Sequence, residues 1–211
     1  LKSMEQYYRI GKAQNWDEWR SAMSIGGIAS TNFIYADKTG RIAYVYNALF
    51  PQRKAGYNYE NVLPGDTSAS MWQNTVSLAQ MPQILNPASG FVFNANNTPF
   101  VAAGPGSELN PANFSPLLGI ERRTTNRMVR ANELLSADTS ITPAELLAIK
   151  FDTAYSRNSF AGGWMAKIMA LDLGKEPDLL LAQKLLVTWD WNSDGNAKAD
   201  ALGEAMMHLA N

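Results

Sequence analysis

The residues best suited to chemistry in this sequence are amide and guanidinium side chains. Asn94, Asn96 and Asn97 lie within four residues, and a neutral amide at a strand end is a fixed N–H donor of the kind an oxyanion hole needs. The alternative is a polar turn in which the asparagine side chains bond their own backbone, and composition alone favours it. Arg127, in a helix-like run, is by the same reasoning a solvated surface arginine.

Histidine and cysteine chemistry is nearly absent from the chain. His208 is the single histidine, and there is no cysteine. A Ser-His-Asp triad or a histidine zinc site would depend on that one residue, so the composition argues against both classes of site. The absence of cysteine excludes a thiol nucleophile, a thiolate metal site and a disulfide framework within the sequence.

A second group of polar residues begins like a calcium-binding loop. Asp190, Asn192 and Asp194 alternate and are followed by Gly195, the glycine expected at the sharp turn. Position twelve of such a loop, where a bidentate Glu belongs, is Ala201. The three residues are therefore weak calcium candidates, and a helix–turn–helix corner closed by Asx turns is the simpler interpretation.

Helix signals occur near the start of the chain and through its second half. Residues 15–24 carry Asn15 as a cap with Glu18 three positions later, and Thr142 and Glu145 form the same kind of capping box. The helices expected in the second half are at about residues 125–136, 143–151, 161–172, 177–188 and 199–209.

Strand signals are confined to the first half. Residues 31–36 and 41–46 are rich in β-branched and aromatic side chains, and Asp37–Gly40 between them predicts a hairpin turn. Residues 51–89 read as a long irregular stretch, and residues 91–94 as a short strand. The order predicts an α+β fold, with sheet strands and long loops over residues 1–120 and mainly helices over 121–211.

Composition bounds the possible partners. The chain has 211 residues, of which 46% are hydrophobic and 18% charged, with a formal net charge of −1. This balance gives no reason to expect a nucleic-acid or membrane partner. No apolar run approaches the roughly 18 residues needed to cross a bilayer. The low charge content indicates that other protein covers part of the surface.

Several ordered blocks of the sequence resemble the β-chain of the penicillin acylase family, which includes acyl-homoserine lactone and aculeacin acylases. The blocks fall within about residues 8–150, and a looser one follows later. They read NWDEWRSAM, TNFIYADKTGRIAYVYNALFPQR, LPGDTSASMW, MPQILNPASGFVFNANNTP, TNRMVRANELLSADTSITPAELLAIKFD and LLVTWDWNSDGNAKADALGEA. Agreement of separate blocks in one order makes the resemblance specific.

The resemblance implies a fold and a chemistry. These enzymes are N-terminal nucleophile (Ntn) hydrolases with an αββα architecture, in which a precursor cuts itself and exposes the nucleophile, usually Ser. Its own α-amino group serves as the base, so a histidine is not required. By position, Asn96 matches the oxyanion-hole asparagine of the family and Arg127 its active-site arginine. The resemblance implies no required cofactor, although calcium is possible in the parent enzyme.

Compared with the family, the sequence is expected to be an internal fragment of the β-chain. It starts at Leu1 and contains no Ser-Asn dipeptide such as begins the family's β-chain. We therefore expect it to be inactive alone and to need the α-chain and the nucleophile segment as partners. The expected substrate is a small N-acyl amide, and the expected location of the parent is the periplasm or the exterior.

Two other functions remain open at the level of sequence. The first is an acylase relative that has lost catalysis and acts as a binding or assembly domain. The second is an independent extracellular binding module, which fits the aromatic content but not the ordered blocks.

Overall fold

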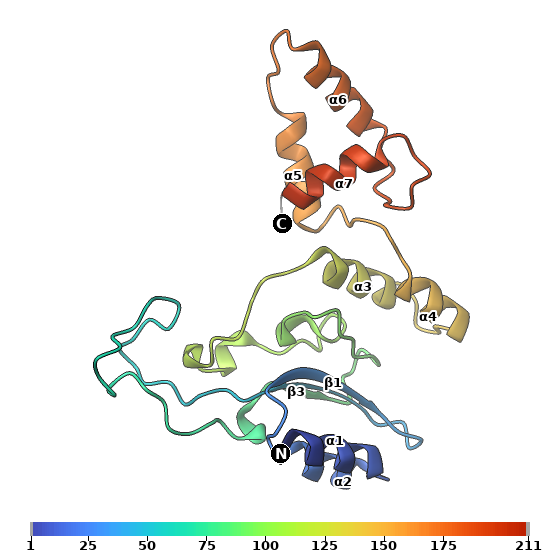
Figure 1. The fold of residues 1–211 in the computed structure, drawn as a ribbon. Coiled ribbons are helices and arrows are strands. Elements are labelled where there is room, and N and C mark those ends of the chain that lie inside the picture. Colours follow the sequence, from blue (N-terminus) through green and yellow to red (C-terminus); the bar gives the residue numbers. More distant parts are fainter. Residues whose placement is uncertain (1, 210–211) are drawn as a thin grey trace. The chain divides into compact units, whose positions relative to one another are not determined.

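The computed structural model describes residues 2–209 and divides the chain into two compact units, Leu1–Arg122 and Arg123–Asn211 (Figure 1). Each unit is described by itself below. The first contains the sheet, and the second is helical.

The first unit is built on a three-stranded antiparallel sheet in the order β1-β2-β3. The strands are β1 Ser30–Ala36, β2 Ile42–Ala48 and β3 Gln83–Leu85. The carboxylate of Asp37 closes the β1–β2 turn by accepting the backbone N–H groups of Thr39 (2.8 Å) and Arg41 (3.3 Å). The predicted hairpin is therefore confirmed.

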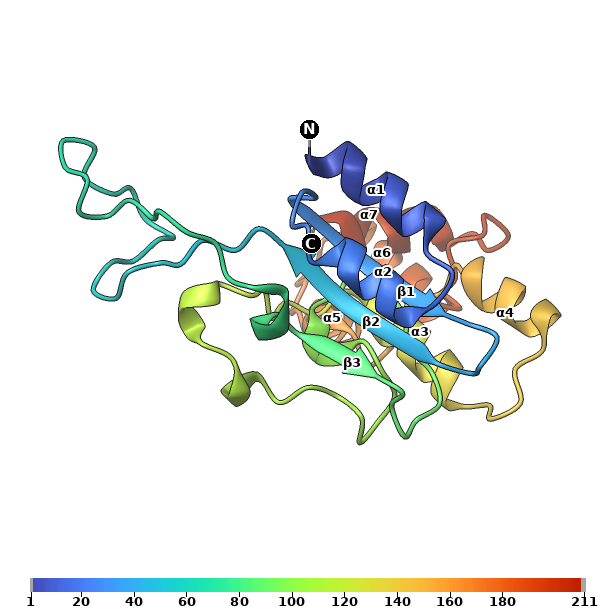
Figure 2. The same ribbon diagram turned by 90° about the horizontal axis from the view of Figure 1, so that it is seen from below.

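Two helices cover one face of this sheet, α1 Lys2–Lys12 and α2 Trp16–Met23 (Figures 1 and 2). The indoles of Trp16 and Trp19 in α2 pack with Ala43 and Val45, whose side chains share that face of β2. The predicted cap is present, since Oδ1 of Asn15 accepts the backbone N–H of Glu18 at 3.0 Å.

No local sequence signal predicted the helix α1. Its anchor is Gln6, a fully buried amide whose Oε1 accepts the N–H groups of Gly27 (2.6 Å) and Ile28 (3.0 Å). Its Nε2 donates to the carbonyl of Met23 at 3.3 Å. These partners lie 17 to 22 residues away in the sequence, so no local pattern announces them.

The opposite face of the sheet is covered by the segment that follows β3. Tyr44 of β2 packs there with Ile84, Ala102 and Ala103. Residues 91–94, predicted as a strand, form only one isolated bridge, between Val92 and Ala103.

Two predictions about this region were wrong. Residues 91–94 do not continue as a strand, because the asparagines that follow satisfy the backbone with side-chain bonds, which compete with a ladder. Residues 51–89 are not irregular throughout, since they contain β3 and the short 3-10 helix η1 Leu78–Gln80. The pairing of β3 with β2 is non-local and leaves little trace in three residues.

The second unit consists of five helices: α3 Asn126–Ser136, α4 Pro143–Lys150, α5 Phe160–Met169, α6 Pro177–Val187 and α7 Asp200–Leu209. Each was predicted, with ends that agree to within about three residues. Met165 and Ile168 of α5, Leu186 of α6 and Met207 of α7 share one core around Trp189. The Thr142 and Glu145 capping box at the start of α4 is confirmed.

The predicted α+β class is confirmed, with the strands in the first unit and most helices in the second. Within residues 2–209, no helix combines the length and the apolar character needed to cross a membrane.

Candidate functional site

The asparagine cluster forms a tight loop that its own side chains hold together. Oδ1 of Asn94 accepts the backbone N–H of Asn96 at 3.0 Å. The same oxygen accepts Nδ2 of Asn32, which lies on β1, also at 3.0 Å. The start of the loop is thereby attached to the edge strand of the sheet.

Asn97 fixes the other end of this loop from inside the protein. Its side chain is only 4% exposed. Oδ1 accepts the backbone N–H of Ala95 at 2.6 Å, and Nδ2 donates to the carbonyls of Thr98 (3.0 Å) and Val101 (2.5 Å). The latter two residues flank or end the short helix η2 Pro99–Val101. Asn97 thus connects the loop to this turn.

Asn96 lies at the tip, with a φ of 58°. Asparagine tolerates this left-handed region better than most residues. Its side chain is exposed, whereas that of Asn97 is buried. Each sequence interpretation therefore describes part of the loop: Asn94 and Asn97 bond nearby backbone, and Asn96 presents its amide at the surface of this unit.

Arg127 belongs to the second unit, in the first turn of α3, and its side chain is exposed. The neighbouring Asn126 attaches this turn to a following loop. Its Nδ2 donates to the carbonyl of Ala154 (3.1 Å), and its Oδ1 accepts the backbone N–H of Ser156 (2.8 Å). The position of the turn that carries Arg127 is therefore set by non-local hydrogen bonds.

Two further residues on the same face of α3 strengthen this attachment. Arg130 makes a bidentate pair with Asp152, with Nε–Oδ1 at 2.8 Å and Nη2–Oδ2 at 2.9 Å. This pairing raises the pKa of Arg130. Oε1 of Glu133 accepts Oγ of Ser156 and Nδ2 of Asn158, both at 2.7 Å.

Sequence reasoning missed this network. The sequence feature that could have indicated the network is the spacing of residues 126, 130 and 133, which places polar side chains along one side of a helix.

The predicted calcium candidates are engaged with each other and with the backbone. Oδ1 of Asp190 accepts the N–H of Asn192 at 3.0 Å, and Oδ1 of Asp194 accepts the N–H of Asn196 at 3.0 Å. Asn192 donates Nδ2 to Oδ2 of Asp194 (2.8 Å), and its Oδ1 accepts the Thr153 hydroxyl (2.6 Å).

In this arrangement Oδ1 of Asp190, both carboxylate oxygens of Asp194 and the amide oxygen of Asn192 already accept hydrogen bonds. Over the described part of the chain, no three His, Cys, Asp or Glu side chains gather to hold a metal. Calcium at this loop remains a prediction. His208 is exposed, with Nε2 3.9 Å from a carboxylate oxygen of Glu204.

Comparisons with known proteins identify a family and two relatives. The family model described as penicillin amidase matches residues 1–211. Penicillin G acylase of Escherichia coli is 33% identical over 129 residues, which are 60% of this chain and 14% of that protein.

The solved structure of a thermostable penicillin G acylase from Alcaligenes faecalis has a similar fold. Its TM-score is 0.63 at 22% sequence identity, and the match covers 92% of this chain and 34% of that one. The chain therefore has the penicillin acylase (Ntn hydrolase) fold over a minor part of the length of either relative.

Proposed function

The chain belongs to the penicillin amidase family, and from this premise we propose that it is the part of a longer N-acyl amide hydrolase that supplies two active-site groups. Asn96 provides the oxyanion-hole amide, and Arg127 provides an active-site guanidinium. The nucleophile comes from the processed N-terminus of the β-chain, outside this segment. The remaining chains of the acylase are thus its partners.

The observation that carries the proposal is how the loop around Asn96 is held. An oxyanion donor contributes most when it is fixed before the reaction, because no free energy is then spent on orienting it in the transition state. Asn94 holds the backbone of Asn96 directly, and the buried Asn97 holds the residue before it. The side chain of Asn96 is exposed on this unit, where another part of an enzyme can reach it.

The proposed reaction is amide hydrolysis through an acyl-enzyme. The nucleophile attacks the carbonyl carbon, and its proton passes to the α-amino base. Nδ2 of Asn96 donates to the oxygen that becomes negative. Collapse of the intermediate breaks the C–N bond and releases the amine, which takes up the proton. Water then hydrolyses the acyl-enzyme to a carboxylate. The positive charge of Arg127 favours the negative charge that develops on the carbonyl oxygen.

The proposed substrates are linear N-acyl amides, such as acyl-homoserine lactones, lipopeptide side chains or β-lactam amides. The acyl pocket is built largely from residues outside this segment. We also propose that the whole protein matures by self-cleavage and acts in the periplasm or outside the cell.

The test is Asn96→Ala in the whole protein, with turnover of an N-acyl amide as readout. Loss of one oxyanion donor lowers kcat by about a hundredfold or more, with a small change in KM. Asn61→Ala, at another exposed asparagine of the same unit, serves as the control with unchanged kcat. Unaltered turnover in Asn96→Ala would refute the assignment of Asn96.

N-terminal sequencing of the mature β-chain separates this proposal from loss of catalysis. Ser, Thr or Cys at the first position supports a working hydrolase. Any other residue, or an unprocessed chain, indicates a relative that keeps the fold without the reaction.

A further inference from the structure

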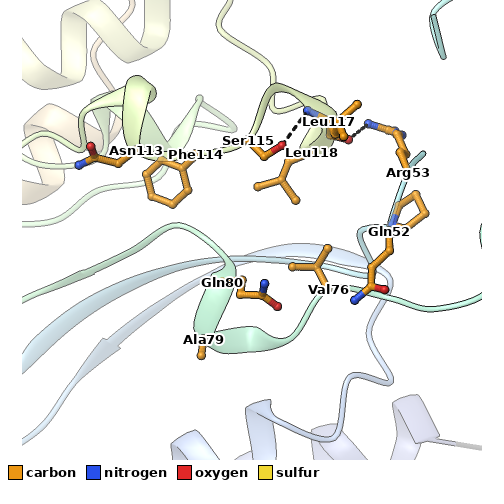
Figure 3. A pocket seen from close by; sticks show the side chains of 11 residues that line it. Gln52, Arg53, Val76, Ala79, Gln80, Asn113, Phe114, Ser115, Leu117 and Leu118 are labelled. Carbon is orange, nitrogen blue, oxygen red and sulfur yellow. Dashed lines mark hydrogen bonds between the residues drawn. The ribbon is translucent and has the colours of Figure 1, made fainter. Parts of the chain in front are cut away.

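The first unit contains a pocket of about 530 Å³, and the loop that carries Asn96 does not line it (Figure 3). Its size lies in the range of about 300–1,000 Å³ typical of small-molecule sites. Val76 lines one side, and Phe114 and Leu118 line the other, so the middle of the pocket is apolar. Amide side chains, including those of Gln52 and Gln80, lie around these residues.

Backbone pairing keeps the wall that carries Val76 in place. The N–H of Val76 donates to the carbonyl of Phe50 at 2.8 Å, and the N–H of Gln52 donates to the carbonyl of Asn74 at 2.9 Å. The opposite wall consists of the short helices η3 Pro111–Asn113 and η4 Pro116–Leu118 and the residues between them. The pocket therefore has hydrogen-bonded backbone on both sides.

Arg53 supplies the charge at one end of the pocket. Its Nη1 donates to the carbonyl of Leu117 at 3.0 Å, and its guanidinium lies 5.5 Å from the centre of the Tyr59 ring. No carboxylate among residues 2–209 forms an ion pair with it, and none of the lining residues is acidic. Since a guanidinium has five N–H groups, donors remain available for an anion.

Gly119 explains how the guanidinium reaches this place. Its φ is 63°, and a Cβ added there would meet Nη1 of Arg53. The glycine that ends η4 thus leaves the space that the charged group occupies. A larger residue at position 119 would displace the guanidinium from Leu117.

From this combination we propose that the pocket binds an apolar monocarboxylate. The carboxylate pairs with Arg53, and the hydrocarbon part lies along Val76, Phe114 and Leu118. A guanidinium prefers a carboxylate because two parallel N–H···O bonds can form. The inference goes beyond the proposed function and does not depend on it.

The pocket also has a physical connection to the asparagine loop. The ring of Phe114 lies 5.8 Å from that of Phe100, centre to centre. Phe100 belongs to η2, whose end at Val101 is hydrogen-bonded to Asn97. An occupant that contacts Phe114 is therefore linked to the loop that carries Asn96 through the ring contact with Phe100 and the hydrogen bond between Val101 and Asn97.

Octanoate is the probe for the test, with binding to the whole protein measured by calorimetry. Hexanoate should bind about fifteen-fold more weakly, because each buried methylene contributes about fourfold. Acetate has the carboxylate without the long chain, and 1-octanol has the chain without the carboxylate. Each should bind at least tenfold more weakly than octanoate.

Variants test whether octanoate binds in this pocket. Arg53→Gln should weaken octanoate binding at least tenfold, and Arg20→Gln, at an exposed arginine of α2, should leave it within twofold. Gly119→Ala should weaken it as well, through displacement of Arg53. Far-UV circular dichroism checks that each variant is folded. Asn96→Ala should retain full binding, so this proposal and the proposed function can fail separately.

Three outcomes would overturn the proposal. The first is no octanoate binding by the whole protein, which would mean that another part of the acylase fills the pocket. The second is equal affinity for octanoate and 1-octanol. The third is a folded Arg53→Gln variant with unchanged affinity.

Discussion

Asn97→Ala tests whether the buried amide holds the proposed catalytic loop. The side chain is 4% exposed and takes part in three hydrogen bonds to backbone groups. The substitution removes all three hydrogen bonds at once and leaves the backbone groups in place. It leaves the side chain of Asn96 unchanged, so any effect on the reaction must act through position.

The magnitude follows from the bonds lost. Each hydrogen bond contributes about 1 kcal/mol net, so the free energy of unfolding should fall by about 3 kcal/mol. The carbonyls of Thr98 and Val101 lose a donor where little water can replace it. Because domains are stable by only about 5–15 kcal/mol, this is a large fraction of the total.

Two assays measure the effect on the whole protein. Urea unfolding gives the change in stability, and amide hydrogen exchange at Ala95 reports on the loop directly, because its N–H loses the bond to Oδ1 of Asn97. If Asn96 acts as proposed, kcat should also fall by about tenfold while KM changes little, because a displaced donor stabilises the transition state less. The control is Asn61→Ala, whose exposed side chain should make the cost close to zero.

The reasoning would be refuted by a stability loss below about 1 kcal/mol together with unchanged exchange at Ala95. A stability loss with normal kcat would keep the structural role of Asn97 and reject its role in holding Asn96 for the reaction.

Four further outcomes are expected. Arg130→Ala should lower stability by about 1 kcal/mol, since its bidentate pair with Asp152 is only partly exposed; double-mutant unfolding measures the coupling, and a value of zero contradicts it. The hydrogen bond from the Thr39 hydroxyl is the main cause that lowers the pKa of Asp37 to about 2. The ionised carboxylate therefore stabilises the fold above its ordinary pKa, and this stability is lost as the pH falls through about 2. Asp37→Asn should flatten the acid unfolding curve in that range. Tyr44→Phe should leave stability unchanged or raise it by up to about 1 kcal/mol, because the buried hydroxyl has no partner among the described residues; a melting point several degrees lower would contradict this. The satisfied side chains of residues 190–196 lead us to expect no change in melting temperature with a calcium chelator, and a clear decrease would restore the calcium site.

Helices α2 to α7 and the hairpin were predictable because their signals are local. Asn15 caps α2 through an N–H three residues away, and Thr142 caps α4 in the same manner. Asp37 closes its turn within four residues. A short segment contains both partners of each bond, so the same geometry is favoured before the rest of the chain folds.

The elements that were missed depend on distant partners. Helix α1 is held by Gln6 against residues 17 to 22 positions away, and β3 is a strand only because β2 offers it a paired edge. Conversely, residues 91–94 have the composition of a strand but form only the bridge between Val92 and Ala103, because the asparagine side chains that follow bond the backbone. Composition alone could not separate these cases.

The same division holds for the candidate site. The sequence by itself marked Asn96 and Arg127, through residue types and family resemblance, and it determined that no histidine or cysteine chemistry other than at His208 was available. Only the tertiary structure decided that Asn97 is buried beneath the loop, that Asn126 attaches the turn carrying Arg127 to a distant loop, and that Arg53 faces an apolar pocket. Burial and long-range hydrogen bonds depend on how the folded chain excludes water. They are therefore properties of the packed molecule, which a one-dimensional pattern does not contain.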